Sequence, residues 1–185
     1  MTLALLSCCA PCSVGVLQAF CEQKRPCTVI FFNPNIAPVR EYEQRRDEQK
    51  RLCQELNFPF VELPYTPDDW ARVILGLEQE PERGLRCRSC FSYRLKMGAQ
   101  YAKKHGFEVF TSVFGVSRYK NMEEITALGI QIGQEIGIPY LDTNWRKGGL
   151  EQKRLDGIKR FSLYQQSYCG CIYSSRPKSE PLDIR

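Results

Sequence analysis

The chain has 185 residues, of which 43% are hydrophobic and 25% are charged, and its formal net charge is +5. This length suits one domain with a sizeable core, and the composition excludes a disordered chain. The modest positive charge permits a polyanionic partner without requiring one. No stretch reaches the roughly 20 apolar residues of a membrane helix, and the start lacks a secretory signal, so we expect a cytoplasmic protein.

Short apolar strands alternate with helices in the first half of the chain. The pattern predicts strands at 3–6, 27–35 and 58–65, and helices at 14–20, 40–56 and 70–77. The first helix is expected to open directly after the turn SCCAPCS. Asp68 or Asp69 is expected to cap the helix at 70–77.

The same alternation continues in the second half. The pattern predicts helices at 91–104, 125–136 and 150–161, strands at 108–115 and 138–145, and a loop leading to RCRSC at 86–90. Residues 1–175 are therefore expected to form one α/β domain, a parallel sheet with helices on both faces. The tail at 176–185 is rich in proline and charge, and we expect it to be loose.

Several polar motifs follow predicted strands. SCCAPCS, FFNPN, FTSVFG and YLDTNW each end a strand or come directly after one. Ligands of open parallel sheets bind beyond the carboxyl ends of the strands, so these motifs are expected to meet at one rim.

Seven of the ten cysteines fall in three tight groups along the chain. The groups are Cys8, Cys9 and Cys12, then Cys87 and Cys90, then Cys169 and Cys171. Such short spacings let one turn present two sulfurs to one metal centre, and we predict all seven as metal ligands. Seven thiols exceed one zinc site, and all-thiolate ligation is typical of iron–sulfur clusters.

The remaining cysteines and the single histidine look structural. Cys21 and Cys53 lie on predicted helices and Cys27 begins a strand, where a free cysteine behaves as a small apolar residue. His105 stands at a predicted helix end, where its charge is favourable.

The motifs and their order resemble those of the QueH-type epoxyqueuosine reductases over about residues 3–175. The matching pieces are CCAPCS at 8–13, FFNPNIAPVREYEQR at 31–45, RCRSCFSYRL at 86–95, SRYKN at 117–121, DTNWRKGG at 142–149 and LYQQSYCGCIYS at 163–174. The chain departs from the family pattern at Gln165, where arginine is common, and at Arg118, where proline is frequent.

The resemblance implies the last step of queuosine biosynthesis in tRNA. The epoxide of epoxyqueuosine is reduced to the alkene, and water is released. It also implies an α/β fold like that of the adenine-nucleotide alpha-hydrolases (HUP or PP-loop type), a 4Fe–4S cluster, an adjacent mononuclear iron, an external electron donor and no cobalamin. A nucleotide loop after the first strand would then have become a metal loop.

The resemblance and the motifs together assign roles to individual residues. The expected cofactor ligands are Cys8, Cys9, Cys87, Cys90, Cys169 and Cys171, with Cys12 adjacent and also a catalytic candidate. Their division between cluster and lone iron is left open. The other catalytic candidates are Tyr119, Lys120 and Asp142, with Tyr168 as a further possible proton donor.

The substrate contacts are expected from polar, basic and aromatic residues in the same motifs. They are Asn33, Asn35, Arg40, Tyr42, Arg94, Trp145, Arg146 and Lys147. Basic groups, Arg45 and Lys120 included, suit tRNA phosphates, and aromatic rings suit an unpaired base. The run RRDEQKR at 45–51 is otherwise expected to be an exposed helix face.

Three other functions remain open from the residues alone. A thiol-disulfide oxidoreductase would use CxxC pairs and needs no metal. A zinc-stabilised RNA-binding module would hold zinc and carry out no redox chemistry. An ATP-dependent tRNA-modifying enzyme would need a glycine-rich phosphate loop, which the sequence lacks.

Overall fold

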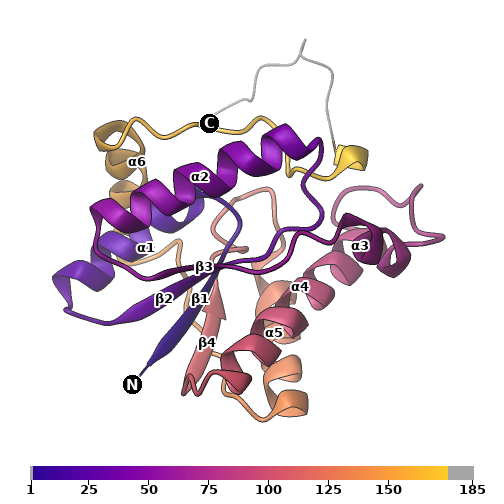
Figure 1. Cartoon of the computed structure of the whole chain (residues 1–185), viewed down its shortest axis with the longest axis horizontal. Coiled ribbons are helices and arrows are strands. Elements are labelled where there is room, and N and C mark those ends of the chain that lie inside the picture. The colour runs from indigo at the N-terminus through magenta and orange to yellow at the C-terminus, as the bar shows by residue number, and fades with distance from the viewer. Residues whose placement is uncertain (1, 175–185) are drawn as a thin grey trace.

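A computed structural model describes residues 2–174. Figure 1 shows a twisted sheet in the middle of the molecule with helices on both sides. The predicted loose tail lies outside the described residues, and the domain limit at residue 175 stays a prediction. No helix within 2–174 is both long enough and apolar enough to cross a membrane.

The sheet has four parallel strands in the order β3-β2-β1-β4. They are β1 (Leu3–Ser7), β2 (Cys27–Phe31), β3 (Phe60–Glu62) and β4 (Val109–Ser112). Leu3 pairs with Cys27 on one side and with Val109 on the other. All five residues of β1 are buried, as expected for the central strand of a parallel sheet that is covered on both faces.

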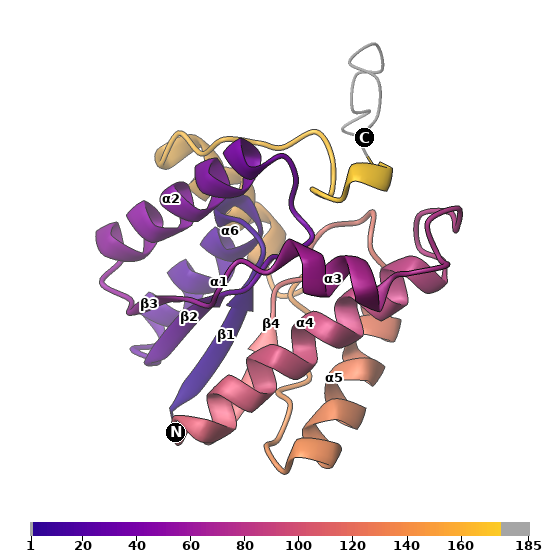
Figure 2. The ribbon, with the colours of Figure 1, turned by 45° about the vertical axis from the view of Figure 1, so that its right-hand side comes forward.

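Two layers of helices cover the sheet (Figure 2). One layer contains α1 (Ala10–Glu22), α2 (Val39–Glu55) and α6 (Leu150–Arg160), and the other contains α4 (Leu85–Lys104) and α5 (Met122–Ile136). The short α3 (Pro67–Val73) packs on α4, and a 3-10 turn, η1, spans Ile172–Ser174. The predicted α/β class is confirmed.

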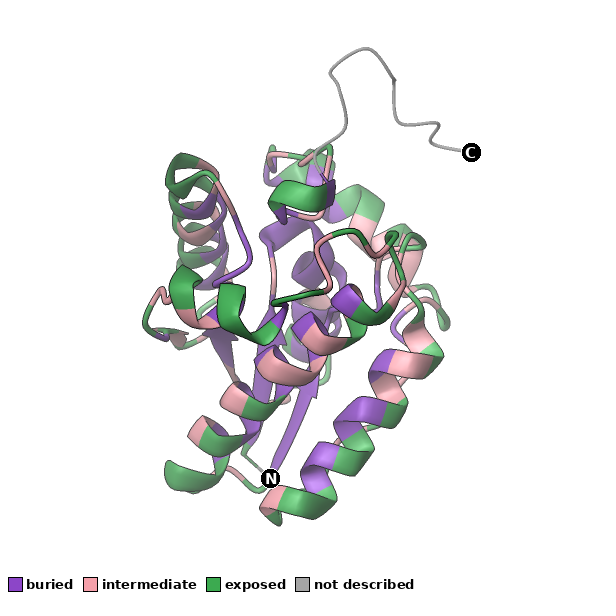
Figure 3. Cartoon of the chain, turned by 90° about the vertical axis from the view of Figure 1, so that its right-hand side faces the viewer, coloured by how far each residue is buried: buried purple, intermediate pink, exposed green. Residues whose placement is uncertain are grey.

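The alternation of side chains in β1 divides the core between the two layers. Leu3 and Leu5 pack with α1 and α6, whereas Ala4 and Leu6 pack with α4 and α5. Figure 3 shows the result, with buried strands at the centre and helices whose outer faces are exposed. Helix α6 lies close against α1 because Gly15 has no side chain: a Cβ there would stand 2.7 Å from the Leu150 carbonyl oxygen.

The strand order places a topological switch point at the carboxyl ends of β1 and β4. The chain moves from β1 through β2 to β3 in one direction, while β4 pairs with the opposite edge of β1. Loops that leave such neighbouring strands diverge to opposite faces and leave room for a ligand between them. The cysteine loop follows β1, and the loop that carries Lys120 follows β4.

Several predicted boundaries differ from the structure around the cysteines. Helix α1 begins at Ala10 with Cys9 as its N-cap, so Cys12 lies in the first helical turn and not in the preceding loop. Pro11 fits there because the first turn needs no amide donor. Helix α4 begins at Leu85 and includes RCRSC, which places Cys87 and Cys90 three residues apart on one helix.

Other boundaries are shorter than the sequence pattern suggested. Thr66, and neither Asp68 nor Asp69, is the N-cap of α3; both aspartates lie in the first turn. The predicted strand at 138–145 is reduced to one parallel bridge between Phe110 and Tyr140. Ile138 and Tyr140 of this segment still pack in the core beside α4 and α5, but from a loop.

Candidate metal centre

Three sulfurs meet where β1 ends and α1 begins. The sulfurs of Cys8, Cys9 and Cys12 all lie within 4.8 Å of one another, and those of Cys8 and Cys9 are 3.8 Å apart. Cys9 and Cys12 are buried and Cys8 is half-buried. Thiols at this spacing, shielded from bulk water, can hold a metal ion.

A buried glutamine holds both ends of this cysteine loop. Gln49 on α2 accepts hydrogen bonds at Oε1 from the hydroxyls of Ser7 (2.7 Å) and Ser13 (2.9 Å). Its Nε2 donates to the sulfur of Cys53 at 3.4 Å. Gln49 carries no signal of this role in the sequence, because it lies in a run of charged residues typical of an exposed helix face.

The last described segment, residues 163–174, is called the C-terminal strap and is fastened to α2 by Arg45. The Arg45 guanidinium donates to the carbonyls of Cys169 (2.9 Å) and Tyr168 (3.2 Å), and it pairs with Glu41 at 2.7 Å. Arg45 is only 2% exposed, so its predicted place on an exposed helix face is wrong. Burial at the strap, rather than contact with solvent or RNA, explains why an arginine stands there.

The strap contacts the cysteine loop and the loop after β4. Gln166 Nε2 donates to the sulfur of Cys9 at 2.9 Å. Lys120 Nζ lies 2.6 Å from the sulfur of Cys169. Gly170 has a φ of 110°, which favours glycine, and its carbonyl accepts from the Ala37 amide at 2.8 Å. The strap thereby closes over the loop after β1.

The other cysteines adjoin this centre to different extents. Cys90 and Cys171 pack together with Trp70 and Ile74 in a small buried cluster. Burial raises the pKa of Cys90, and the charge of Cys169 adds to the increase, which places these thiols in one electrostatic environment. The sulfur of Cys87 has a different partner: it accepts a hydrogen bond from the Arg83 backbone amide at 3.4 Å.

Protons are distributed unequally among the three loop thiols. Hydrogen bonds from Cys12 and Cys9 hold the pKa of Cys8 well below its usual value, and Arg94 and Lys120 lower it further. The pKa of Cys12 is raised well above its usual value, because it gives its proton to the hydrogen bond with Cys8. Of these two thiols, Cys8 therefore loses its proton more readily, and the thiolate is the form that binds metal.

Cations lie next to the sulfurs. Arg94 is 2% exposed, donates to the Phe32 carbonyl at 3.3 Å and to Asn33, and stacks over the Phe114 ring at 4.0 Å. Burial tends to raise the pKa of Cys169, but Lys120 and Arg94 outweigh it, so this pKa is lowered. Positive charges held next to buried thiols offset the effect of burial and favour the thiolate form.

The predicted asparagines lie in the loop after β2. Asn33 is fully buried and donates from Nδ2 to the Ser7 carbonyl at 3.0 Å, which ties this loop to the end of β1. Asn35 is also buried, and its Oδ1 has no hydrogen-bond partner among residues 2–174. A buried acceptor without a partner is uncommon in folded proteins.

The two predicted stacking rings are engaged inside the protein. Trp145 is 7% exposed, donates to the Ser112 carbonyl at 3.0 Å and contacts Phe20 edge-on. Tyr42 is buried, its hydroxyl donates to Glu62 at 2.8 Å, and its ring lies 4.0 Å from that of Tyr65. Neither ring is offered to a base in this arrangement.

The predicted basic contacts divide into two kinds. Arg146 is used within the protein, since it donates to the carbonyls of Gly115 (2.8 Å), Ser117 (2.6 Å) and Lys120 (2.9 Å). Arg94 is buried beside the sulfurs, as described above. Arg40 and Lys147 are exposed and remain able to meet a phosphate.

The catalytic candidates also differ in their distance from the sulfurs. Lys120 contacts Cys169 directly, as described above. Tyr119 is 46% exposed at the surface, and the Tyr168 hydroxyl donates to the Ala37 carbonyl. Asp142 is exposed and acts on Tyr140, whose pKa is raised mainly by burial. Lys120 is therefore the candidate that the structure brings to the thiols.

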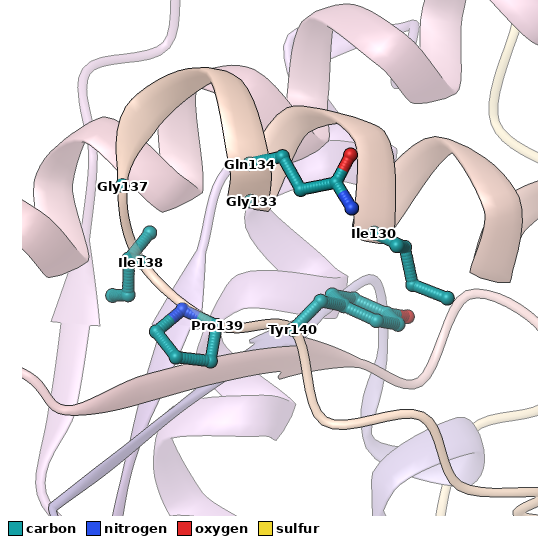
Figure 4. Close-up of a pocket in the computed structure, with 7 residues that line it drawn as sticks. All are labelled: Ile130, Gly133, Gln134, Gly137, Ile138, Pro139 and Tyr140. Atoms are coloured by element: carbon teal, nitrogen blue, oxygen red, sulfur yellow. The ribbon is translucent and has the colours of Figure 1, made fainter.

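An open groove of about 460 Å³ lies elsewhere on the molecule, beside the end of α5. Figure 4 shows Tyr140 beneath Gln134 and Ile130, with Pro139 and Ile138 further along the groove. No cysteine lines it, and the polar side chains in its walls are Gln134 and Tyr140. It is therefore not a candidate for the redox or metal chemistry.

Comparison with known proteins gives a consistent result. Residues 3–177 match the sequence model of the family described as epoxyqueuosine reductase QueH. A protein of that name from Acinetobacter baylyi is 45% identical over 175 residues, covering 94% of this chain and 80% of the relative. The Haemophilus influenzae protein is 43% identical over 179 residues, covering 96% and 73%.

A more distant relative extends the match to nearly full length on both sides. The Thermotoga maritima protein of the same name is 30% identical over 182 residues, covering 97% of this chain and 93% of the relative. The expected resemblance is confirmed, and the chain belongs to the QueH family of epoxyqueuosine reductases.

Proposed function

We propose that this protein is an epoxyqueuosine reductase that converts epoxyqueuosine in tRNA to queuosine. The observation that carries the proposal is the group of three thiols at the end of β1, next to Arg94 and Lys120, with Lys120 also in contact with Cys169 of the strap. A disulfide framework would not need charged partners, whereas anionic metal ligands in a dry site do.

The thiols suit an iron–sulfur cofactor. Cys8, Cys9 and Cys12 offer three sulfurs at one point, and Cys169 adjoins them through Lys120. Cys90 and Cys171 supply further sulfurs next to Cys169, and Cys87 lies on the same helix as Cys90. When bound, a 4Fe–4S cluster supplies single electrons and an adjacent iron supplies a Lewis acid for the epoxide oxygen.

The reaction needs protons as well as electrons. Both carbon–oxygen bonds of the epoxide break, a carbon–carbon double bond forms, and the oxygen leaves as water after taking up two electrons and two protons. The electrons come from an external one-electron donor. Lys120 Nζ lies beside Cys169 and can hold a proton there: burial lowers the pKa of Lys120, but the charge and hydrogen bond of Cys169, with the charge of Cys8, together outweigh burial and raise it.

Two buried acceptors support a polyhydroxylated substrate. Asn35 Oδ1 and Gln166 Oε1 are both buried, and neither has a hydrogen-bond partner within residues 2–174. Gln166 is the residue that donates to Cys9, so its free carbonyl oxygen lies beside the sulfurs. The hydroxyl groups of the modified nucleoside are donors that would satisfy such atoms.

The proposal is tested by direct conversion. Protein purified without oxygen is analysed for iron, sulfide and zinc, then incubated with epoxyqueuosine-tRNA and a chemical reductant. Nucleoside mass spectrometry is expected to detect the loss of one oxygen. The Cys8→Ala variant should lose iron and turnover, while Cys27→Ala should keep both.

Other results would point to a different function. Zinc alone, without iron or sulfide, would support an RNA-binding module. A colourless protein that exchanges disulfides would support a thiol-disulfide oxidoreductase. Iron-loaded protein that leaves epoxyqueuosine unchanged would refute the reductase.

A further inference from the structure

Three arginines gather around the loop that follows β4. Arg83 Nε donates to the Tyr119 carbonyl at 3.0 Å, and Arg146 Nη2 donates to the carbonyls on either side, those of Ser117 and Lys120. Arg118 extends from the same loop, and its side chain is 69% exposed. Two guanidinium groups from distant segments therefore hold a loop that presents a third.

These like charges act on one another. The pKa of Arg146 is lowered, first by partial burial and then by the positive charges of Arg118 and Arg83. The opposing carboxylate is Glu151, but Arg154 already occupies both of its oxygens at 2.9 Å. Its separation from Arg118 is 3.9 Å, too long for a hydrogen bond. An anion placed here would relieve repulsion.

The surface also carries an exposed aromatic ring. Tyr119, which follows Arg118, is 46% exposed. Guanidinium groups beside an accessible aromatic ring are typical of surfaces that bind unpaired nucleic acid, in which phosphates are contacted and bases stack. A partner protein with an acidic surface could also pair with the arginines, but it would not need the aromatic ring.

This surface adjoins two of the cysteines that lie outside the three-sulfur group, Cys87 and Cys169. The backbone amide of Arg83 donates to the sulfur of Cys87. Lys120, two residues after Arg118, contacts the sulfur of Cys169. A chain bound across the arginines therefore has its neighbouring nucleotide beside the thiols.

We propose that Arg83, Arg118 and the neighbouring Tyr119 form the surface that binds the backbone of the unpaired RNA next to the reacting nucleotide. Arg146 is a positioning residue that holds the loop. The inference rests on the proposed function for its choice of RNA. Arginine suits this role because its planar fork can bond two phosphate oxygens at once.

The test is RNA binding by the iron-loaded protein with both charges removed. Binding of a synthetic anticodon stem-loop RNA is measured by fluorescence anisotropy over a range of salt concentrations. The Arg83→Gln/Arg118→Gln variant is expected to bind about 10–100-fold more weakly, as two charge-assisted contacts are lost. The slope of log affinity against log salt should fall by about 2, or about 1 for each lost phosphate contact.

The matched control removes a charge from the opposite end of the molecule. Lys104 is exposed at the end of α4, about 25 Å along the helix axis from Cys87. Lys104→Gln should leave affinity and salt slope unchanged. The double lysine variant, Arg83→Lys/Arg118→Lys, should keep the salt slope while losing part of the affinity, because it keeps charge but not the fork.

The outcomes separate this inference from the proposed function. Unchanged affinity and slope in the double glutamine variant, with wild-type conversion of epoxyqueuosine intact, would overturn the RNA surface alone. A wild-type protein that neither binds the RNA nor reduces the nucleoside would overturn both. The double glutamine variant could instead keep full RNA affinity and lose turnover only when a protein, rather than a chemical reductant, supplies the electrons. That result would assign the arginines to the electron donor and would also overturn the inference.

Discussion

The chain holds cysteines in two contrasting environments. At the carboxyl ends of the strands, Cys8 and Cys169 have lowered pKa values despite burial, since hydrogen bonds, Arg94 and Lys120 favour their thiolates. At the amino ends, burial raises the pKa of Cys27 to about 12 and that of Cys53 to about 11.

The difference shows what lets a buried cysteine lose its proton more easily. Both sets are removed from water, and burial alone favours the neutral thiol. At Cys8 and Cys169 hydrogen bonds and cations outweigh that effect, whereas the Arg25 charge near Cys27 and the Gln49 hydrogen bond to Cys53 do not. The loops after parallel strands can bring such groups together from several segments, whereas Cys27 and Cys53 simply fill the core.

The strongest way to break this comparison is to remove one cysteine from each set. Cys8→Ala is expected to abolish iron binding and turnover, because it removes one sulfur of the three-sulfur group. Cys27→Ala should retain both and lower the free energy of unfolding by only about 1 kcal/mol, for a small apolar group. Iron analysis and chemical denaturation measure the two effects, and equal iron loss in both variants would end the distinction.

Replacing Lys120 tests whether turnover depends on this cation in addition to the thiols. Lys120→Met is expected to lower turnover by about 10²–10⁴-fold through the loss of a positioned proton donor, with most iron retained. Added alkylamines should restore part of the activity of this variant, which a purely structural lysine would not allow. Full turnover in Lys120→Met would remove this residue from the mechanism.

Loosening the strap tests how the third cysteine group is held. Arg45→Met is expected to cost about 3–5 kcal/mol of unfolding free energy, because Glu41 and two carbonyls lose a buried partner. Arg46→Met, one residue along the same helix, breaks a surface ion pair and should cost about 1 kcal/mol or less. Urea denaturation of the iron-free proteins distinguishes the two, and similar midpoints would argue against the strap contact.

The smallest expected change concerns the amide that contacts Cys9. Gln166→Leu should weaken iron retention by about 10–100-fold, the range for residues that orient metal ligands, and shift the reduction potential of the bound iron. Gln165→Leu, at the exposed neighbouring position, should do neither. Chelator competition and potentiometry measure both, and identical behaviour of the two variants would leave Gln166 without an orienting role.

The sequence by itself determined the α/β class, most of the strands and helices, the three cysteine groups and the family. These depend on local periodicity and on spacing along the chain, which a single segment expresses on its own. It also indicated the rim where the motifs meet, because the carboxyl ends of parallel strands share one edge of a sheet.

Only the tertiary structure decided how that rim is built. It buried Arg45 against carbonyls more than 120 residues away, set Lys120 on Cys169, and turned Tyr42 and Trp145 into the protein. Local periodicity assigns a residue to one side of its helix or strand but does not say which distant segment will cover it. That partner is chosen by the packing of the whole chain, so the charges that make these thiols reactive were visible only in the fold.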